Sequence, residues 1–256
     1  MFIDATRYRA FWSSPEAYRL RYIWNLTPTM PEIGMERLLL RGRQRGSAFH
    51  DLMDKKEIGN PTYNSEEIAA AREMVSIVHE KYPYEVPLAQ EVEFEYPIPD
   101  SPHKMVGRID HILDRCGVII VGDWKTCGKT TKKELASRIE AYRADPQVSF
   151  YMVGARTLGY KPEFFLHRIV QKYKIHEVQS FRTDLELKKF ARNVHQTCCI
   201  IESMKEKFGV ELSWPSLHTK YKSGYAAIEG TGMYVGYTPE GFLPRKEHLS
   251  TMEGKL

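Results

Sequence analysis

The spacing of hydrophobic positions divides the chain into a helical beginning, a strand-rich middle and a helical end. Over residues 2–82, apolar side chains recur at helical spacing, which predicts mostly helices. One helix is expected to start at Pro15 with Ser14 as its cap, and another after Asn64 or Ser65. An apolar helical face lies between them and consists of Ala48, Phe49, Leu52 and Met53.

Alternation of apolar and polar residues predicts strands in the middle of the chain. The expected strands cover residues 91–98 (EVEFEYPI), 104–113 (KMVGRIDHIL) and 118–124 (VIIVGDW). Pro-Asp-Ser-Pro and Asp-Arg-Cys-Gly separate them, and both sequences are typical of turns. A polar, lysine-rich segment and a helix ending near Gly159 come next. Two further strands are expected over residues 163–172 and 175–182.

A long amphipathic helix follows, beginning at Thr183. Glu186 stands three residues later, as in a capping box, and Gly209 is a plausible C-terminal stop. Its apolar stripe consists of Phe190, Val194, Cys198, Ile201, Met204 and Phe208. Such a stripe indicates a face packed against the protein core rather than a cofactor site.

The length and composition are those of one globular α/β domain. The chain has 256 residues, of which 42% are hydrophobic and 27% charged, and it contains no internal repeat or low-complexity tract. We expect a helical cap over residues 1–85, a catalytic α/β core over 86–182, and a C-terminal helix with an aromatic tail over 183–256.

Charge and cysteine content indicate the cellular compartment of the protein more than the reaction that it catalyses. A net charge of +4 permits a nucleic-acid partner without requiring one. No apolar run reaches the roughly 18 residues that would cross a bilayer, and residues 1–14 lack the apolar region of a secretory signal. The four cysteines, which show no CxxC pair or metal-ligand spacing, are expected to be buried, reduced thiols: Cys116, Cys127, Cys198 and Cys199. We therefore expect an intracellular protein without a membrane partner.

The densest chemical signal is the segment GRIDHILDRCGVIIVGDWKT. Its alternation predicts a β-hairpin that turns near residues 114–117 and brings Asp110 close to Asp123. Asp123 and Lys125 are two residues apart, so in a strand they point to the same face. The apolar run before them indicates a buried strand, where carboxylates are costly unless a cation neutralises them.

A divalent metal would fit these residues. Mg²⁺ prefers carboxylate and carbonyl oxygens and keeps several waters. Asp110, Asp123 and the backbone carbonyl of Trp124 would supply such ligands, leaving positions for a phosphate and a water. Such a metal polarises the phosphoryl oxygen and lowers the pKa of the water, while Lys125 would orient or help to deprotonate that water.

This segment resembles the PD-(D/E)xK nuclease superfamily. Asp110 matches the first acid, and Asp123-Trp124-Lys125 matches the D-x-K element. Gln147 and Tyr151 are similar to the Q-x-x-x-Y motif of the RecB-like and Cas4-like branch, and four residues place them on one helix face. Residues 46–50 (GSAFH) resemble the G-x-x-x-H helix of that branch, and residues 13–18 its opening Cys-Pro-x-x-Tyr helix.

The resemblance implies a restriction-endonuclease-like fold. A central mixed β-sheet would be flanked by helices, and the helical N-terminal cap would arch over the active site. It implies that His50 is an added metal ligand, and that Gln147 and Tyr151 help to place Lys125 and the DNA strand. Phage recombination nucleases and the mitochondrial genome maintenance exonuclease are similar in layout.

The chain departs from many such relatives at their iron–sulfur cluster. That cluster takes one N-terminal and three C-terminal cysteines, but Ser14 stands at the first position here and residues 214–230 contain no cysteine. Because the cluster requires thiolates, we predict that none is bound. The tail aromatics Trp214, Tyr221 and Tyr225 are expected to pack in its place.

Several further residues are candidates for contacts with DNA. Arg43 and Arg45, with Arg41, precede His50 and could bind phosphates. Thr126 could contact a phosphate or end the strand. Glu91 or Glu93 could be an auxiliary acid, although we expect both to face solvent. A lysine set could bind the DNA backbone or form a solvated face: Lys129, Lys132 and Lys133.

These features predict a Mg²⁺- or Mn²⁺-dependent deoxyribonuclease. The expected mode is exonucleolytic, on single-stranded DNA or duplex ends, in DNA replication, recombination or repair, with partner proteins of those processes. The expected setting is a bacterial or phage-infected cell, or an organelle. The alternatives are a DNA-binding or scaffold protein that retains the fold without cleaving, and an endonuclease.

Overall fold

The computed structural model describes residues 1–28, 35–54, 63–128, 131–171, 174–209 and 242–244. The described helices are α1 (Ala5–Ser13), α2 (Pro15–Tyr18), the π-helix η1 (Arg19–Ile23), α3 (Met35–Met53), α4 (Ser65–Lys81), α5 (Lys132–Arg143), α6 (Pro146–Thr157) and α7 (Asp184–Phe208). The described strands are β1 (Phe2–Ile3), β2 (Leu26–Pro28), β3 (Pro87–Pro97), β4 (Lys104–Arg115), β5 (Val118–Thr126), β6 (Phe164–Gln171), β7 (Lys174–Ser180) and β8 (Phe242–Pro244). None of the described helices is both long and apolar enough to span a bilayer.

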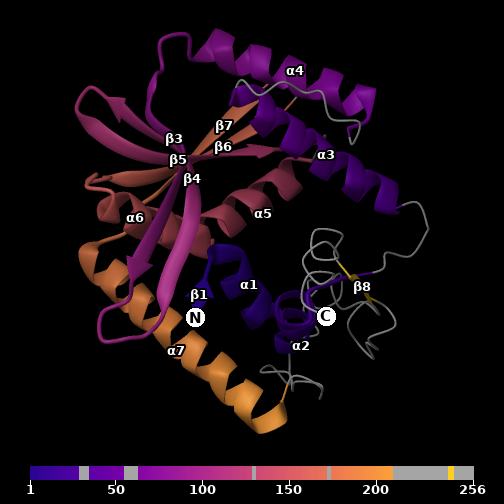
Figure 1. The fold of residues 1–256 in the computed structure, drawn as a ribbon. Coiled ribbons are helices and arrows are strands. Elements are labelled where there is room, and N and C mark those ends of the chain that lie inside the picture. Colours follow the sequence, from indigo (N-terminus) through magenta and orange to yellow (C-terminus); the bar gives the residue numbers. More distant parts are fainter. Residues whose placement is uncertain (29–34, 55–62, 129–130, 172–173, 210–241, 245–256) are drawn as a thin grey trace, which may run out of the picture.

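The central sheet is mixed and has helices on both faces. Its strand order is β1-β4-β5-β6-β7, with β3 paired to β4. The β1–β4 and β5–β6 pairs are parallel, and the other pairs of this sheet are antiparallel. Helices α3 and α4 lie on one side of the sheet, and α1, α5, α6 and α7 on the other (Figure 1). The predicted α/β class, with a central mixed sheet between helices, is confirmed.

Side-chain caps fix where several helices start. The side chain of Asn64 accepts a hydrogen bond from the backbone of Glu66, so Asn64 rather than Ser65 caps α4. Thr183 and Glu186 form a capping box at the start of α7, as predicted. Gly209 ends this helix with φ = 66°, a conformation that favours glycine.

The β4–β5 hairpin turns where the sequence predicts. Arg115 pairs with Val118, and the two residues between them, Cys116 and Gly117, have φ values of 57° and 87°. Two positive φ values characterise the type I′ turn, whose twist matches that of the strands. The side chain of Asp114 closes the turn by accepting a 2.6 Å hydrogen bond from the Gly117 backbone nitrogen.

Strands β4 and β5 separate toward the other end of this hairpin. Their last paired residues are His111 and Gly122. Beyond that pair, β4 stays paired with β3, whereas β5 stays paired with β6 as far as Thr126. Residues 106–110 of β4 therefore have a strand partner on the β3 side but none on the β5 side among the described residues. We call this opening the fork.

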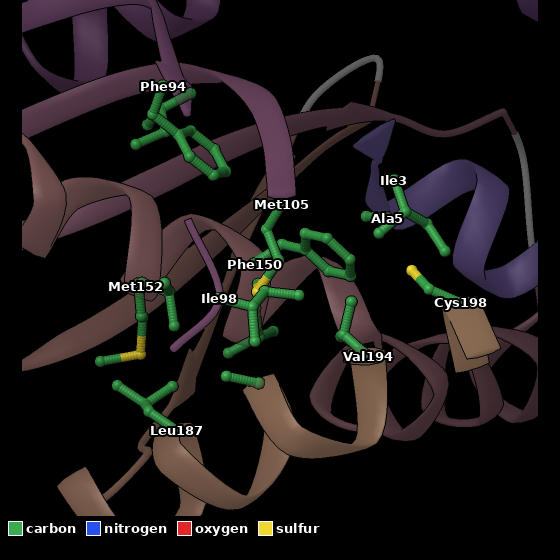
Figure 2. Close-up of a cluster of buried hydrophobic side chains, with 14 of the residues drawn as sticks. Ile3, Ala5, Phe94, Ile98, Met105, Phe150, Met152, Leu187, Val194 and Cys198 are labelled. Atoms are coloured by element: carbon green, nitrogen blue, oxygen red, sulfur yellow. The ribbon is translucent and has the colours of Figure 1, made fainter. Parts of the chain in front are cut away.

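Two hydrophobic layers hold the sheet. The larger layer lies between the sheet and helices α1, α6 and α7, and includes Phe150, Leu187 and Val194 (Figure 2). The smaller layer lies under α3 and α4, where Phe49 packs on Trp124 with ring centroids 6.0 Å apart. Residues of β5 therefore alternate between the two layers, and Trp124 faces away from the side chains of its two neighbours in the chain.

The N-terminal region differs in part from the prediction. Most of its described residues are helical, but residues 2–3 form β1 in the central sheet, and Ile3 is fully buried in the larger layer. A strand of two residues is too short to produce a readable alternation. The predicted packing of Trp214, Tyr221 and Tyr225 lies outside the described residues.

The prediction of four buried thiols is wrong for two cysteines. Cys127 and Cys198 are buried, whereas Cys116 and Cys199 are exposed. Cys116 occupies the exposed hairpin turn. Cys199 lies on α7 directly after a buried position, and the helix turn rotates it away from the core.

Candidate active site

Asp123 and Lys125 lie on the face of β5 that points toward α6. The Lys125 ammonium lies 2.8 Å from Asp123 Oδ1 and 2.7 Å from Oδ2. Asp123 is only 1% exposed. The strand period of two places both side chains on one face, as predicted, and the preceding apolar run buries them.

Gln147 joins this pair from the first turn of α6. Its side-chain nitrogen donates to Asp123 Oδ1 at 2.8 Å, and its side-chain oxygen accepts from Lys125 Nζ at 3.2 Å. Asp145 caps α6 by accepting from the Gln147 backbone nitrogen at 2.8 Å, and also binds Arg9 Nη1 at 2.6 Å. The helix cap therefore fixes where the amide reaches the strand.

Asp110 lies across the fork from these residues. Its Oδ2 accepts a 3.3 Å hydrogen bond from the Trp124 backbone nitrogen. His50, from α3, has its Nδ1 at 3.7 Å from the same oxygen and its Nε2 at 3.2 Å from the Trp124 carbonyl oxygen. The structure thus brings Asp110, His50 and the Trp124 carbonyl to one place, as the sequence predicts.

Glu91 also reaches this place, contrary to the expectation that it faces solvent. Single ligand atoms of His50, Glu91 and Asp110 all lie within 4.8 Å of one another. Glu91 has φ = 46°, a left-handed conformation that interrupts the alternation of β3, so the strand pattern could not predict its direction. Its Oε2 also forms a 2.6 Å ion pair with Arg108 Nε.

Burial and charge shift the pKa values of the three central groups in different directions. Burial and the negative charge of Asp123 raise the pKa of Asp110 well above its usual range. Burial alone would raise the pKa of Asp123, but the Lys125 ammonium and other neighbouring positive charges outweigh it and lower that pKa. Burial would lower the pKa of Lys125, but both carboxylates raise it. These directions favour the ammonium form of Lys125 and the carboxylate form of Asp123, and they make the ionised form of Asp110 the most costly of the three charges.

These groups fit a divalent cation. Asp123 Oδ2 is buried and forms no hydrogen bond with the described residues, although it lies near the ammonium. A divalent ion would offset the repulsion that raises the pKa of Asp110. The possible ligands are mainly oxygens, which suits Mg²⁺ or Mn²⁺. They are the clustered side chains of His50, Glu91 and Asp110, the Trp124 carbonyl beside His50, and the predicted ligand Asp123, which lies outside that cluster.

A cavity of about 800 Å³ opens onto these groups. Its lining includes Asp110, Lys125 and Gln147, together with two arginines that the sequence did not single out, Arg9 and Arg108. Arg108 stands two residues before Asp110, so alternation in β4 could have identified it. Arg9 comes from α1, and only the fold shows its position.

Tyr151 lies one turn after Gln147 and lines the same cavity. Its ring meets the edge of Phe94 with centroids 6.4 Å apart, and burial raises the pKa of its hydroxyl. A side chain on Gly107 would bring a Cβ within 2.8 Å of Phe94 and 3.6 Å of Tyr151. Glycine at this position therefore leaves room for both rings.

The residues that were predicted to contact DNA from α3 and from the end of β5 lie in different surroundings. Arg45 forms a 2.7 Å ion pair with the buried Glu67 of α4, which directs its guanidinium to that helix rather than into the cavity. The side chain of Arg43 lies outside the described residues. Thr126 ends β5 and is half-buried, and a Cβ on Gly46 would lie 3.3 Å from its Oγ1. Gly46 therefore permits the close approach of α3 to β5.

Among the lysines after β5, Lys132 and Lys133 are exposed on α5, and Lys129 lies outside the described residues. Neither described lysine lines the cavity.

The chain is similar in fold to known proteins. A solved structure from Eubacterium rectale, described as "Putative exonuclease", is similar to this chain with a TM-score of 0.53 and 17% identity, over 85% of this chain and 86% of that one. At this identity the similarity shows a shared fold. The protein SSO0001 aligns over 78% of this chain and 76% of its own, at 15% identity and a TM-score of 0.38, from which nothing follows. No curated protein sequence matches the chain.

The family model of the PD-(D/E)XK nuclease superfamily matches residues 55–211, more than half of the chain. That span includes Asp110, Asp123, Lys125, Gln147 and Tyr151. The chain belongs to the PD-(D/E)XK nuclease superfamily.

Proposed function

We propose that this nuclease is a Mg²⁺- or Mn²⁺-dependent DNA exonuclease of the RecB-like and Cas4-like branch. One observation carries the proposal: Asp110, Asp123 and Lys125 meet at the fork, beside the cavity. A paired sheet has no room for a phosphodiester between two strands, whereas at the fork Asp110 and Lys125 line the cavity and Asp123 lies buried beside Lys125. The Q-x-x-x-Y and G-x-x-x-H motifs support the choice of branch.

In this proposal the acidic groups and His50 hold the metal. Asp110, Asp123, Glu91 and the Trp124 carbonyl supply its oxygens. A bound divalent ion would polarise the phosphoryl oxygen and lower the pKa of a bound water.

The chain's own residues supply the remaining functions. Lys125 would orient the attacking water or help to deprotonate it, and its charge would offset charge on the phosphate. Gln147 holds this ammonium beside Asp123. Arg9 and Arg108 lie on the cavity wall, where they would bind flanking phosphates. Thr126 could contact the same strand from the end of β5.

DNA labelled separately at each end tests the reaction. The full chain would be incubated with single-stranded and blunt duplex DNA in Mg²⁺ or Mn²⁺, with EDTA as a control. An exonuclease releases one end label as mononucleotides or short fragments and spares closed circular DNA. Asp123→Ala should abolish the release, while the matched exposed change Asp100→Ala should not.

Two results would contradict the proposal. Cleavage of closed circular DNA would indicate an endonuclease. Tight binding without cleavage in either metal would indicate a DNA-binding or scaffold protein that retains the fold.

The proposal includes no iron–sulfur cluster. Ser14 occupies the position at which similar nucleases have their first cysteine, and its backbone carbonyl accepts a hydrogen bond from the Tyr18 backbone nitrogen. Protein produced in iron-rich medium and purified without oxygen should contain no stoichiometric iron and should lack the visible absorbance of a cluster. Stoichiometric iron and sulfide would contradict this expectation. Roles in DNA replication, recombination or repair, and partners from those processes, belong to the same proposal.

A further inference from the structure

A second group of possible metal-binding side chains lies where the β3–β4 connection meets α7. His103 stands in the β3–β4 connection, and His195 and Cys199 lie on α7. One ligand atom from each of them lies within 4.8 Å of the others. Cys199 Sγ is 3.9 Å from His103 Nε2 and 3.7 Å from His195 Nε2.

These distances are close to those that one tetrahedral metal ion requires. Zn–N bonds of about 2.0–2.1 Å and Zn–S bonds of about 2.3 Å separate tetrahedral ligand atoms by about 3.4–3.6 Å. Glu202 offers a fourth ligand, because its Oε2 lies 3.5 Å from His103 Nε2. Glu202 is placed only against His103, so its carboxylate would have to move toward His195 and Cys199 to complete the shell.

The helix and the loop orient these ligands toward one point. His195 and Cys199 are four residues apart on α7, so they share one helix face, and Glu202 is three residues further. Ser101 Oγ lies 2.7 Å from His195 Nδ1 and accepts a 3.1 Å hydrogen bond from the His103 backbone nitrogen. This contact occupies Nδ1 of His195, and Cys199 Sγ lies 3.7 Å from Nε2 and 3.9 Å from Nδ1.

His103 is oriented in the same way. It is 1% exposed, and the backbone nitrogen of Met1 lies 3.2 Å from its Nδ1. Nε2 is thus left toward Cys199 and Glu202. In metal-binding histidines the second ring nitrogen commonly donates a hydrogen bond, which fixes the ring and its tautomer.

We propose that His103, His195, Cys199 and Glu202 form a zinc-class metal site. Imidazole and thiolate ligands favour Zn²⁺ or a similar borderline-soft ion, whereas the oxygen-rich groups at the fork favour Mg²⁺ or Mn²⁺. The metal would join the β3–β4 connection to α7, two segments about 90 residues apart in sequence. Its role is structural, and it stands independently of the proposed exonuclease activity.

Cobalt titration of the full chain tests this site. The protein would be stripped with a chelator, dialysed and titrated with Co²⁺ in the Asp110→Asn/Asp123→Asn background, which weakens metal binding at the fork. One equivalent of Co²⁺ should produce intense tetrahedral absorption and a thiolate-to-cobalt charge-transfer band. Zn²⁺ should then displace the cobalt and remove both signals.

Single substitutions assign the ligands. Cys199→Ser should remove the charge-transfer band and weaken binding by about 100-fold or more, since loss of even an outer hydrogen-bond partner costs about 10–100-fold. Ser101→Ala should keep the band and weaken binding by about tenfold. Cys116→Ser, the matched change at the other exposed cysteine, should alter neither.

Two outcomes would overturn the proposal. One is the absence of a charge-transfer band at stoichiometric Co²⁺, and the other is a band that persists in Cys199→Ser. Either would leave a polar network in which His103 contacts Glu202. Because Cys199 is exposed, its change to serine should keep the circular dichroism spectrum of the chain and its Mg²⁺-dependent nuclease rate. A failure of the nuclease proposal would leave the cobalt result unaffected.

Discussion

The side-chain amide of Gln147 bridges Asp123 and Lys125. Its nitrogen donates to the carboxylate at 2.8 Å, and its oxygen accepts from the ammonium at 3.2 Å. An amide can serve both partners at once because it carries a donor and an acceptor. A carboxyl or an alkyl group at this position would satisfy one partner or neither.

Gln147→Leu should therefore reduce turnover more than it reduces DNA affinity. Without the bridge the ammonium can move, and a displacement of about 1 Å at a catalytic group can cost about 100-fold in rate. Single-turnover and steady-state rates on labelled single-stranded DNA would separate kcat from KM. The matched change Gln179→Leu, at an exposed position of β7, should leave both unchanged. An equal loss in the two variants would contradict a positioning role.

Asp110→Asn should inactivate the enzyme yet stabilise the metal-free protein. Burial and the charge of Asp123 raise the pKa of Asp110, so its ionised form opposes folding at neutral pH. Each unit of such a shift corresponds to about 1.4 kcal/mol. Thermal unfolding in EDTA should show a higher Tm for the variant, and added Mg²⁺ should stabilise the native chain more than the variant. A lower Tm in EDTA would contradict this account.

Acid should destabilise the protein through two buried histidines on the sheet. Burial lowers the pKa of His111 to about 3 and that of His167 to about 4. An unfolded histidine has a pKa of about 6.5, so the unfolded state binds protons that the folded state excludes. Stability is therefore complete above pH 6.5 and falls as the pH decreases from there toward the folded values.

His111→Leu should remove part of this acid sensitivity. Between pH 6.5 and pH 5, each histidine should cost about 2 kcal/mol, since one pH unit corresponds to about 1.4 kcal/mol. Urea unfolding at both pH values measures the difference. His79→Leu, at an exposed position of α4, should keep the full pH dependence. A pH dependence that is identical in His111→Leu and the native chain would contradict the assignment.

Glu85 should contribute far more to stability than an exposed acid in a comparable ion pair. Arg168 is fully buried and binds Glu85 through both terminal nitrogens, while its guanidinium lies 4.7 Å from the Trp124 ring centroid. Removing one partner of a buried ion pair costs about 3–5 kcal/mol, because the other charge stays buried.

Urea unfolding of Glu85→Ala and Glu95→Ala tests this difference. Glu95 pairs with Lys104 on the surface, where such a pair contributes about 1 kcal/mol or less. Comparable losses in the two variants would show that Arg168 finds other partners.

Local periodicity predicted the parts of the site that a single strand or hairpin determines. Asp123 and Lys125 share a face because strands have a period of two, and the turn at residues 116–117 sets Asp110 opposite that strand. Gln147 was identified by its motif, and the cap on α6 explains its reach.

Contacts between elements that are far apart in the sequence could not be predicted from local periodicity. Glu91 turns toward the site because of one left-handed residue, which strand alternation cannot indicate. Arg45 was expected to contact DNA, but its partner is a glutamate on another helix. The four-residue spacing of His195 and Cys199 is readable in the sequence, whereas the approach of His103 depends on where the β3–β4 connection meets α7.

The fork places Asp110 and Asp123 on different parts of the sheet. Asp110 is carried by the arm made of β3 and β4, and Asp123 by the arm made of β5, β6 and β7. No ladder hydrogen bonds cross between the arms beyond His111 and Gly122, so a small rotation of one arm changes the separation of the acids while each arm keeps its own pairing. The spacing of the two carboxylates is thus adjustable, and a substrate or ion that contacts both would set it.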